Sequence, residues 1–185
     1  MATSLGSRGF ALTWTEPASS SNYESDIYLS IYDQTGSTTV NRTLVNQTTT
    51  GDQLKSDITY TSNDQILVTW QGVGETGEIY GRWFSAVDGT AITNEFLINS
   101  NTAGNQKSAS ITSMADGSTA ISWLTAGMDP SSNGIYLSVT PPQPQPPIRG
   151  NSFYKIVDGP SWIEAEGKSS ALGGHLTTIN DASEN

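Results

Sequence analysis

Residues 65–90 read "QILVTWQGVGETGEIYGRWFSAVDGT" and hold two apolar, aromatic-rich segments, a glycine-rich loop and an Asp-Gly pair. β-branched and aromatic residues favour strands, and Asp-Gly favours a tight hairpin turn. Segments 66–71 and 78–84 are therefore predicted to be neighbouring antiparallel strands. The chain as a whole is only 14% charged and rich in Ser, Thr, Asn and Gln, a composition that disfavours long helices.

The same pattern recurs along the first 140 residues. A tryptophan returns at spacings of 56 and 53, an Ile-Tyr pair at spacings of 52 and 56, and a glutamine at a spacing of 53. Three landmarks with one period predict an internal repeat. The landmarks are Trp14, Trp70 and Trp123; Ile27-Tyr28, Ile79-Tyr80 and Ile135-Tyr136; and Gln53 and Gln106.

Each full unit is predicted to contain four short strands. In the middle unit these are residues 56–61, 66–71, 78–84 and 95–100. The units span 8–48, 49–100 and 101–140. The first unit is expected to lack its first strand, because the chain begins at the second, and the third unit to lack its fourth. Strand alternation in "IYLSIYD" places Ile27, Leu29 and Ile31 on one face, and Tyr28, Ser30 and Tyr32 on the other.

A repeated four-stranded antiparallel unit of about 50 residues is typical of a β-propeller blade. The pattern "ILVTWQ…GEIYGRWFSAVDGT…EFLIN" also resembles repeats of large secreted or surface proteins of bacteria, and the resemblance covers roughly residues 8–140. A closed propeller needs about 4 to 8 blades. We therefore expect this region not to close alone. Further blades, association of copies through open sheet edges, and sandwich packing stay open as alternatives.

Residues 141–150 are proline-rich and are predicted to form an extended linker outside any sheet. Beyond it, residues 152–157 are predicted as a strand, 161–172 as a helix that a Ser161–Glu164 capping box begins, and 175–179 as a second strand.

Residues 151–185 resemble the beginning of the C-type lectin-like domain. Trp162, Ala165, the run "LGGHLTTI" at 172–179 and Glu184-Asn185 carry the resemblance. It implies a truncated α+β domain without the disulfide of many relatives, since Ser169 stands where they often have cysteine. The family's sugar-binding calcium motifs lie further along such a domain and have no counterpart in these residues.

Charge and composition exclude several function classes. The net charge is −10, from 18 acidic and 8 basic residues with no basic run, so nucleic acid and anionic lipid are unfavourable partners. The chain has no cysteine and one histidine, His175, which we interpret as structural. No apolar stretch reaches the roughly 18 to 20 residues of a membrane helix. The start does not resemble a signal peptide, so the protein is either cytoplasmic or, as we expect, extracellular or cell-surface with its export signal elsewhere.

Several side chains admit a functional and a structural interpretation. The repeated tryptophans could stack on sugar rings, but their fixed strand position favours a role in the core. Asp33, Asp88 and Asp116 could bind calcium, but their places beside glycine favour turn chemistry.

Two further pairs of residues match short functional patterns. Glu75 and Glu78 could form a glycosidase carboxylate pair, an interpretation that we do not favour. Asn41 and Asn46 fit the glycosylation sequon, which matters only in a eukaryotic secretory route. No catalytic, ligand-binding or metal-binding residue is assigned from the sequence.

The sequence therefore predicts a mainly β, non-enzymatic fragment of an extracellular adhesion or carbohydrate-binding protein, in which repeats display a lectin-like domain. One alternative is a structural spacer or assembly module of a large surface protein, and another is the binding annex of a secreted hydrolase. No cofactor is expected, although calcium is possible in the full-length protein. Glycans or cell-surface proteins are the expected partners, with self-association through open sheet edges.

Overall fold

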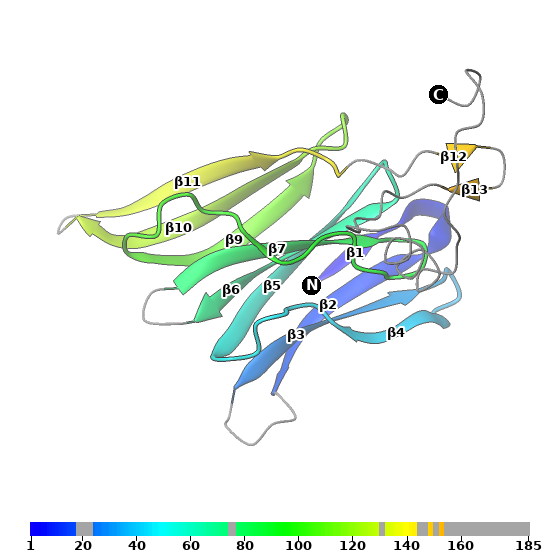
Figure 1. Cartoon of the computed structure of the whole chain (residues 1–185), viewed down its shortest axis with the longest axis horizontal. Coiled ribbons are helices and arrows are strands. Elements are labelled where there is room, and N and C mark those ends of the chain that lie inside the picture. The colour runs from blue at the N-terminus through cyan, green and yellow to red at the C-terminus, as the bar shows by residue number, and fades with distance from the viewer. Residues whose placement is uncertain (18–23, 74–76, 130–131, 144–147, 150–151, 154–185) are drawn as a thin grey trace, which may run out of the picture. The chain divides into compact units, whose positions relative to one another are not determined.

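The computed structural model describes residues 1–17, 24–73, 77–129, 132–143, 148–149 and 152–153 (Figure 1). The chain divides into two compact units, Met1–Gln143 and Pro144–Asn185. The strands of the first unit form three antiparallel sheets, and the described residues contain no α-helix. The prediction of a mainly β chain with repeated antiparallel units is therefore confirmed.

The first sheet has four strands in the order β1-β2-β3-β4. They are β1 (Ala2–Ser4), β2 (Phe10–Pro17), β3 (Ser25–Tyr32) and β4 (Thr38–Leu44). The prediction that this unit lacks its first strand is wrong, because β1 pairs with β2 on the side away from β3. The strand escapes sequence analysis because "ATS" has no alternation of apolar residues.

A short 3-10 helix, η1 (Gly6–Arg8), joins β1 to β2 and ends at Gly9. Gly9 has a φ of 121°, and a Cβ built there would lie 2.1 Å from the carbonyl oxygen of Tyr32. Only glycine fits both the backbone conformation and the close approach to β3. Leu5, just before the helix, is buried in the core of the stack.

The second sheet has the order β5-β6-β7-β8 and the third the order β11-β10-β9. The second consists of β5 (Asp52–Thr61), β6 (Gln65–Val73), β7 (Gly77–Ser85) and β8 (Phe96–Leu97). The third consists of β9 (Asn105–Ser113), β10 (Thr119–Asp129) and β11 (Ser132–Thr140). The fourth strand of the middle unit, expected over 95–100, is only two residues long. Among the described residues the third unit has no fourth strand, as predicted.

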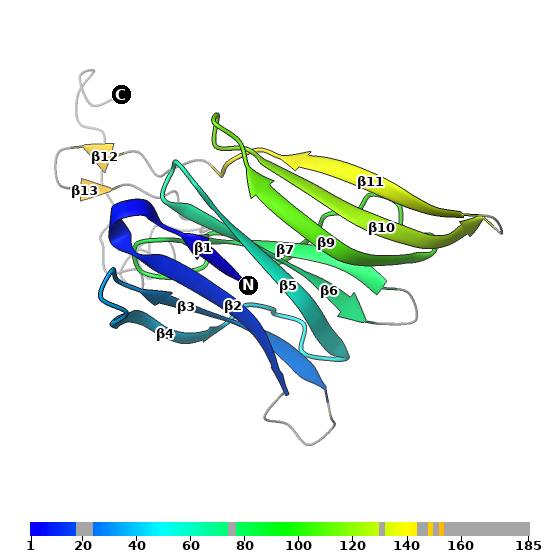
Figure 2. The same cartoon turned by 180° about the vertical axis from the view of Figure 1, so that it is seen from behind.

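The three sheets stack face to face, with the second between the other two (Figures 1 and 2). Strand β5 contacts β1, β2 and β3, and β9 contacts β5, β6 and β7. Two apolar clusters fill the contacts. The cluster between the first and second sheets includes Ile27, Leu29 and Trp70, and the one between the second and third includes Trp83 and Trp123. The core thus lies between sheets, one layer for each contact.

In the second unit, β12 (Ile148–Arg149) pairs antiparallel with β13 (Ser152–Phe153). Ile148 and Arg149 belong to the predicted linker, but they follow its last proline and keep the backbone N–H groups that pairing needs. The predicted helix over 161–172, the strand over 175–179 and His175 lie outside the described residues. The part of the chain that the structure describes has no helix long and apolar enough to span a bilayer.

Candidate functional site

The repeat landmarks meet in a single side-chain arrangement in the second sheet. Trp70 lies directly opposite Tyr80 across β6 and β7, with ring centroids 6.1 Å apart. Its indole Nε1 donates a hydrogen bond of 3.0 Å to Oε1 of Gln53 on β5. One residue from each of three neighbouring strands therefore forms a Gln–Trp–Tyr triad.

The third sheet repeats this triad. Trp123 pairs with Tyr136 at 6.3 Å and donates a 3.1 Å hydrogen bond to Gln106. Trp70 is 1% exposed and Trp123 is 6% exposed. Because each lies in a cluster that contains residues of the preceding sheet, the core interpretation is confirmed for both.

The first sheet departs from this pattern at Trp14. Its ring is half-buried and lies 6.2 Å from the Tyr28 ring, tilted by 32°. Because β1 supplies no glutamine, Nε1 of Trp14 donates instead to Oε1 of Glu16 at 2.6 Å. Arg42 binds the other oxygen of Glu16 at 2.8 Å and lies 3.6 Å above the Tyr28 ring. The hydrogen bonds from Trp14 and then Arg42 lower the pKa of Glu16.

These groups belong to a face that we call the aromatic face. Strand alternation and cross-strand register place its residues on the side of the first sheet opposite Ile27 and Leu29. A stacked Phe10–Tyr32 pair, with ring centroids 5.1 Å apart, continues it along the strands. The aromatic face consists of Phe10, Leu12, Trp14, Tyr28, Tyr32 and Leu44.

The opposite end of the stack carries an aliphatic face on β11. Ile135, Leu137 and Val139 are 75%, 67% and 55% exposed. Their cross-strand pattern turns them away from Trp123 and hence from the second sheet. These three side chains, the aliphatic face, are the largest run of exposed apolar residues among the described strands.

The three turn aspartates bond to their own turns. Oδ1 of Asp33 accepts from the backbone N–H of Thr35 at 2.8 Å and of Ser37 at 2.9 Å. Asp116 likewise accepts from Ser118 at 2.9 Å. The hydroxyl of Thr35 and then the Ser37 amide lower the pKa of Asp33, and Ser118 lowers that of Asp116.

Asp88 accepts from the Thr90 amide at 3.1 Å. Burial opposes ionisation there, but hydrogen bonds from Ser85 and Thr90 outweigh it and lower the pKa of Asp88. Within the described residues, no three acidic or histidine side chains gather as a metal site would require. The hydrogen bonds of all three turn aspartates support the turn interpretation over a calcium site.

Of the disfavoured carboxylate pair, Glu75 and Glu78, the structure describes only Glu78. Glu75 lies outside the described residues. Glu78 accepts a hydrogen bond from Nδ2 of Asn99, whose Oδ1 accepts from the Ile79 amide at 2.7 Å. Glu78 is therefore engaged in holding the segment after β8 against β7.

Asn46 is the counterpart of Asn99 in the first sheet, a structural role that motif reasoning missed. Its Oδ1 accepts from the Ile27 amide at 2.8 Å, and its Nδ2 donates to Asp26 at 2.7 Å. Asn46 is buried, whereas the other sequon residue, Asn41, is exposed. The spacing of 53 between Asn46 and Asn99 matches the repeat and was the available signal.

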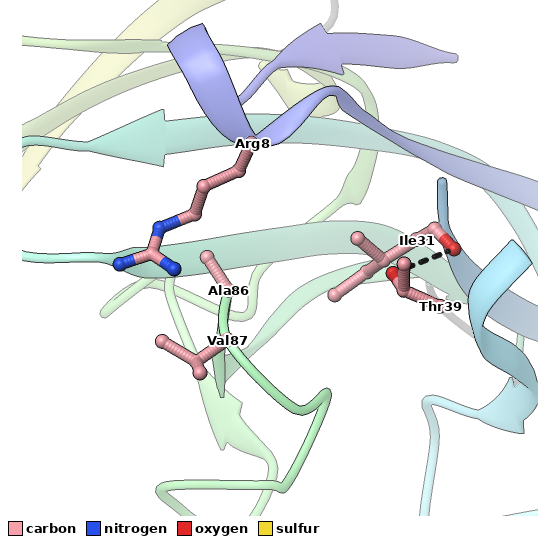
Figure 3. Close-up of a pocket in the computed structure, with 5 residues that line it drawn as sticks. All are labelled: Arg8, Ile31, Thr39, Ala86 and Val87. Atoms are coloured by element: carbon pink, nitrogen blue, oxygen red, sulfur yellow. Dashed lines mark hydrogen bonds between the residues drawn. The ribbon is translucent and has the colours of Figure 1, made fainter. Parts of the chain in front are cut away.

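A small pocket lies between the first two sheets (Figure 3). It has a volume of about 260 Å³ and is lined by Arg8, Ile31, Thr39, Ala86 and Val87. The guanidinium of Arg8 is bound by two hydrogen bonds, of 2.9 and 3.2 Å, to the Asp64 carboxylate. The one charged group of the lining is thus already paired.

Asp64 links the loop after β1 to the turn between β5 and β6. The Tyr60 hydroxyl donates to Oδ1 of Asp64 at 2.6 Å, and this bond, followed by those from Arg8, lowers the pKa of Asp64. The contacts of Asp64 with Arg8 and Tyr60 therefore join the first sheet to the second.

No protein-family model matches the chain, and no curated protein or solved structure matches it either.

Proposed function

We propose that residues 1–143 form a non-enzymatic scaffold of stacked β-repeats. The observation that carries this proposal is the use of one triad in successive units. Trp70 and Trp123 occupy the same strand position, bind the equivalent glutamine and pack against the sheet before them. Residues that a binding site would expose are instead used to join one sheet to the next.

Each sheet in this proposal is a blade-like unit, and the three succeed one another as consecutive propeller blades do. The order of the strands in each sheet follows the chain, and the core lies between sheets. In repeat proteins, stability comes from each unit and from its contacts with its neighbours, which suits a spacer that must stay rigid along its length.

The scaffold in turn would display the lectin-like region of residues 151–185 in an extracellular adhesion protein. The resemblance of that region to the C-type lectin-like domain favours this setting. Glycans or cell-surface proteins are the partners that the resemblance implies. The scaffold proposal for residues 1–143 does not depend on this second step.

Native-state hydrogen exchange tests the scaffold. A rigid stack should open as one unit, so the slowest amides of β3, β6 and β10 should share one opening free energy. Trp123→Ala, which removes the contact of the third sheet with the second, should speed exchange in β6 as well as in β10. Val87→Glu, at an exposed loop position, serves as the control. Independent opening of β10, with β6 unaffected by Trp123→Ala, would refute the scaffold.

A further inference from the structure

The aromatic and aliphatic faces are complementary halves of a contact that the chain already makes twice. In the contact between the first and second sheets, Ile27, Leu29 and Ile31 of β3 are buried against β5, β6 and β7. In the third sheet, Ile135, Leu137 and Val139 hold the equivalent positions after the Ile-Tyr landmark. The aliphatic face therefore corresponds to the β3 side of that contact. No described strand packs against it.

The aromatic face has the residue types that pack against such an aliphatic surface within the chain. The residues of the second sheet that cover the first include Ile66, Val68, Trp70, Tyr80 and Phe84. The repeat places the aromatic face in the same order, and each of its side chains is again apolar or aromatic. The equivalent residues are Phe10, Leu12, Trp14, Tyr28 and Tyr32.

The two faces lie on opposite ends of the stack, so one molecule cannot bring them together (Figures 1 and 2). The aliphatic face is exposed, whereas the aromatic face is half-buried except for exposed Leu44 and for Tyr28, which is 6% exposed. Contiguous apolar surface left accessible on a soluble protein commonly marks an interaction site. We propose that the aliphatic face of one chain docks on the aromatic face of a second copy, continuing the sheet stack from molecule to molecule. The inference rests on the scaffold proposal, because it uses the same contact between sheets.

Such a contact is heterologous, since each copy contributes a different surface. Heterologous contacts leave one free face of each kind on every dimer, and they therefore generate rings or open filaments. The Glu16–Arg42 ion pair lies on the aromatic face itself, because Arg42 covers the Tyr28 ring at 3.6 Å and Glu16 accepts from the Trp14 indole. A second copy would therefore contact this pair, whose two charges bind each other at 2.8 Å. Association would thus bury apolar surface without placing an unpaired charge in the interface.

Sedimentation equilibrium of the whole chain tests the proposal. The average mass of the wild type should rise with concentration above the 19.7 kDa of one chain. Leu137→Glu and Trp14→Glu should each abolish this rise, because each places a charge in one of the two faces. Val87→Glu, an equally polar change at an exposed apolar residue off both faces, should leave it intact.

A mixture of the two defective variants gives the sharpest result. Leu137→Glu keeps its aromatic face and Trp14→Glu keeps its aliphatic face, so together they should form a one-to-one dimer of twice the chain mass and nothing larger. If circular dichroism shows that Trp14→Glu does not fold, Leu44→Glu replaces it, because Leu44 is an exposed residue of the same face.

Three outcomes would overturn the inference. They are a wild type that stays monomeric at all concentrations, a single variant that still associates alone, and a mixture that stays monomeric. A monomeric chain retained on polysaccharide through Trp14 would assign the aromatic face to carbohydrate and would also overturn it. A monomer whose sheets still exchange as one unit would leave the scaffold proposal standing.

Discussion

At the scale of single residues, the triad shows why a tryptophan can be buried in every contact between sheets. Burying an indole N–H without a hydrogen-bond partner costs free energy, so buried tryptophans usually have one. Gln53 and Gln106 supply that partner from the neighbouring strand and are themselves buried. Trp83 is the contrast, since it is fully buried and its Nε1 has no hydrogen-bond partner in the described structure.

Replacing the glutamine should therefore destabilise the stack. Gln53→Leu leaves the Trp70 N–H buried without an acceptor, and we expect the free energy of unfolding to fall by about 1 to 3 kcal/mol. Urea denaturation followed by circular dichroism measures the change. Gln34→Leu, at an exposed turn position, is the matched control and should change stability by less than about 0.5 kcal/mol. Equal losses in the two variants would contradict the role of Gln53.

At the scale of elements, aspartate-closed turns set where strands end. Asp33 begins the turn between β3 and β4, whereas Asp116 lies inside the turn between β9 and β10, which Met114 begins. Each turn contains a glycine with a φ of 83°. Such turns are local, so sequence reasoning located them. The same reasoning missed β1 and extended β8 too far, because neither strand has an apolar alternation of its own.

The turn aspartates should make stability depend on acid pH. Their pKa values in the folded chain lie below the ordinary value of 3.8. Such groups stabilise the folded state above that ordinary value, and their contribution is lost as the pH falls through the lower folded value. We expect the free energy of unfolding to drop below about pH 4 and to drop less steeply in the double variant Asp33→Asn/Asp116→Asn.

Urea denaturation at a series of pH values measures this difference. Parallel acid curves for the wild type and the double variant would contradict it. A rise of the unfolding midpoint on adding calcium, lost in the same variant, would favour metal binding over the turn interpretation.

At the scale of the whole molecule, position in the stack decides what a repeated residue does. Leu29 and Leu137 hold equivalent places in their units, yet Leu29 is fully buried between sheets and Leu137 is exposed at an end. Trp14 differs from Trp70 in the same way, since a preceding sheet covers Trp70 and none among the described residues covers Trp14. Equivalent sequence therefore gives a core residue in the middle and a surface residue at the end.

A pair of charge substitutions tests this difference. Leu29→Glu places an unpaired charge in the core and should lower the free energy of unfolding by more than about 3 kcal/mol or prevent folding. Leu137→Glu should change it by less than about 0.5 kcal/mol, provided that the protein is dilute enough to be monomeric. Thermal unfolding of both variants at low concentration gives the comparison. Similar losses would mean that the aliphatic face is covered within one chain.

Sequence patterns alone located the repeat, most strand positions, the hairpin turns and the residues that alternate between the two faces of each sheet. These features depend on backbone preferences and on a period of two, both of which act over a few neighbouring residues. The stacking of the sheets was needed to show which faces are covered and that Trp70 is core while Trp14 is half-buried. It was also needed to show that Arg8 pairs with Asp64, 56 residues away. Burial and long-range pairing depend on the contact of sheets built from distant segments, and no local pattern encodes which sheet will be the last in the stack.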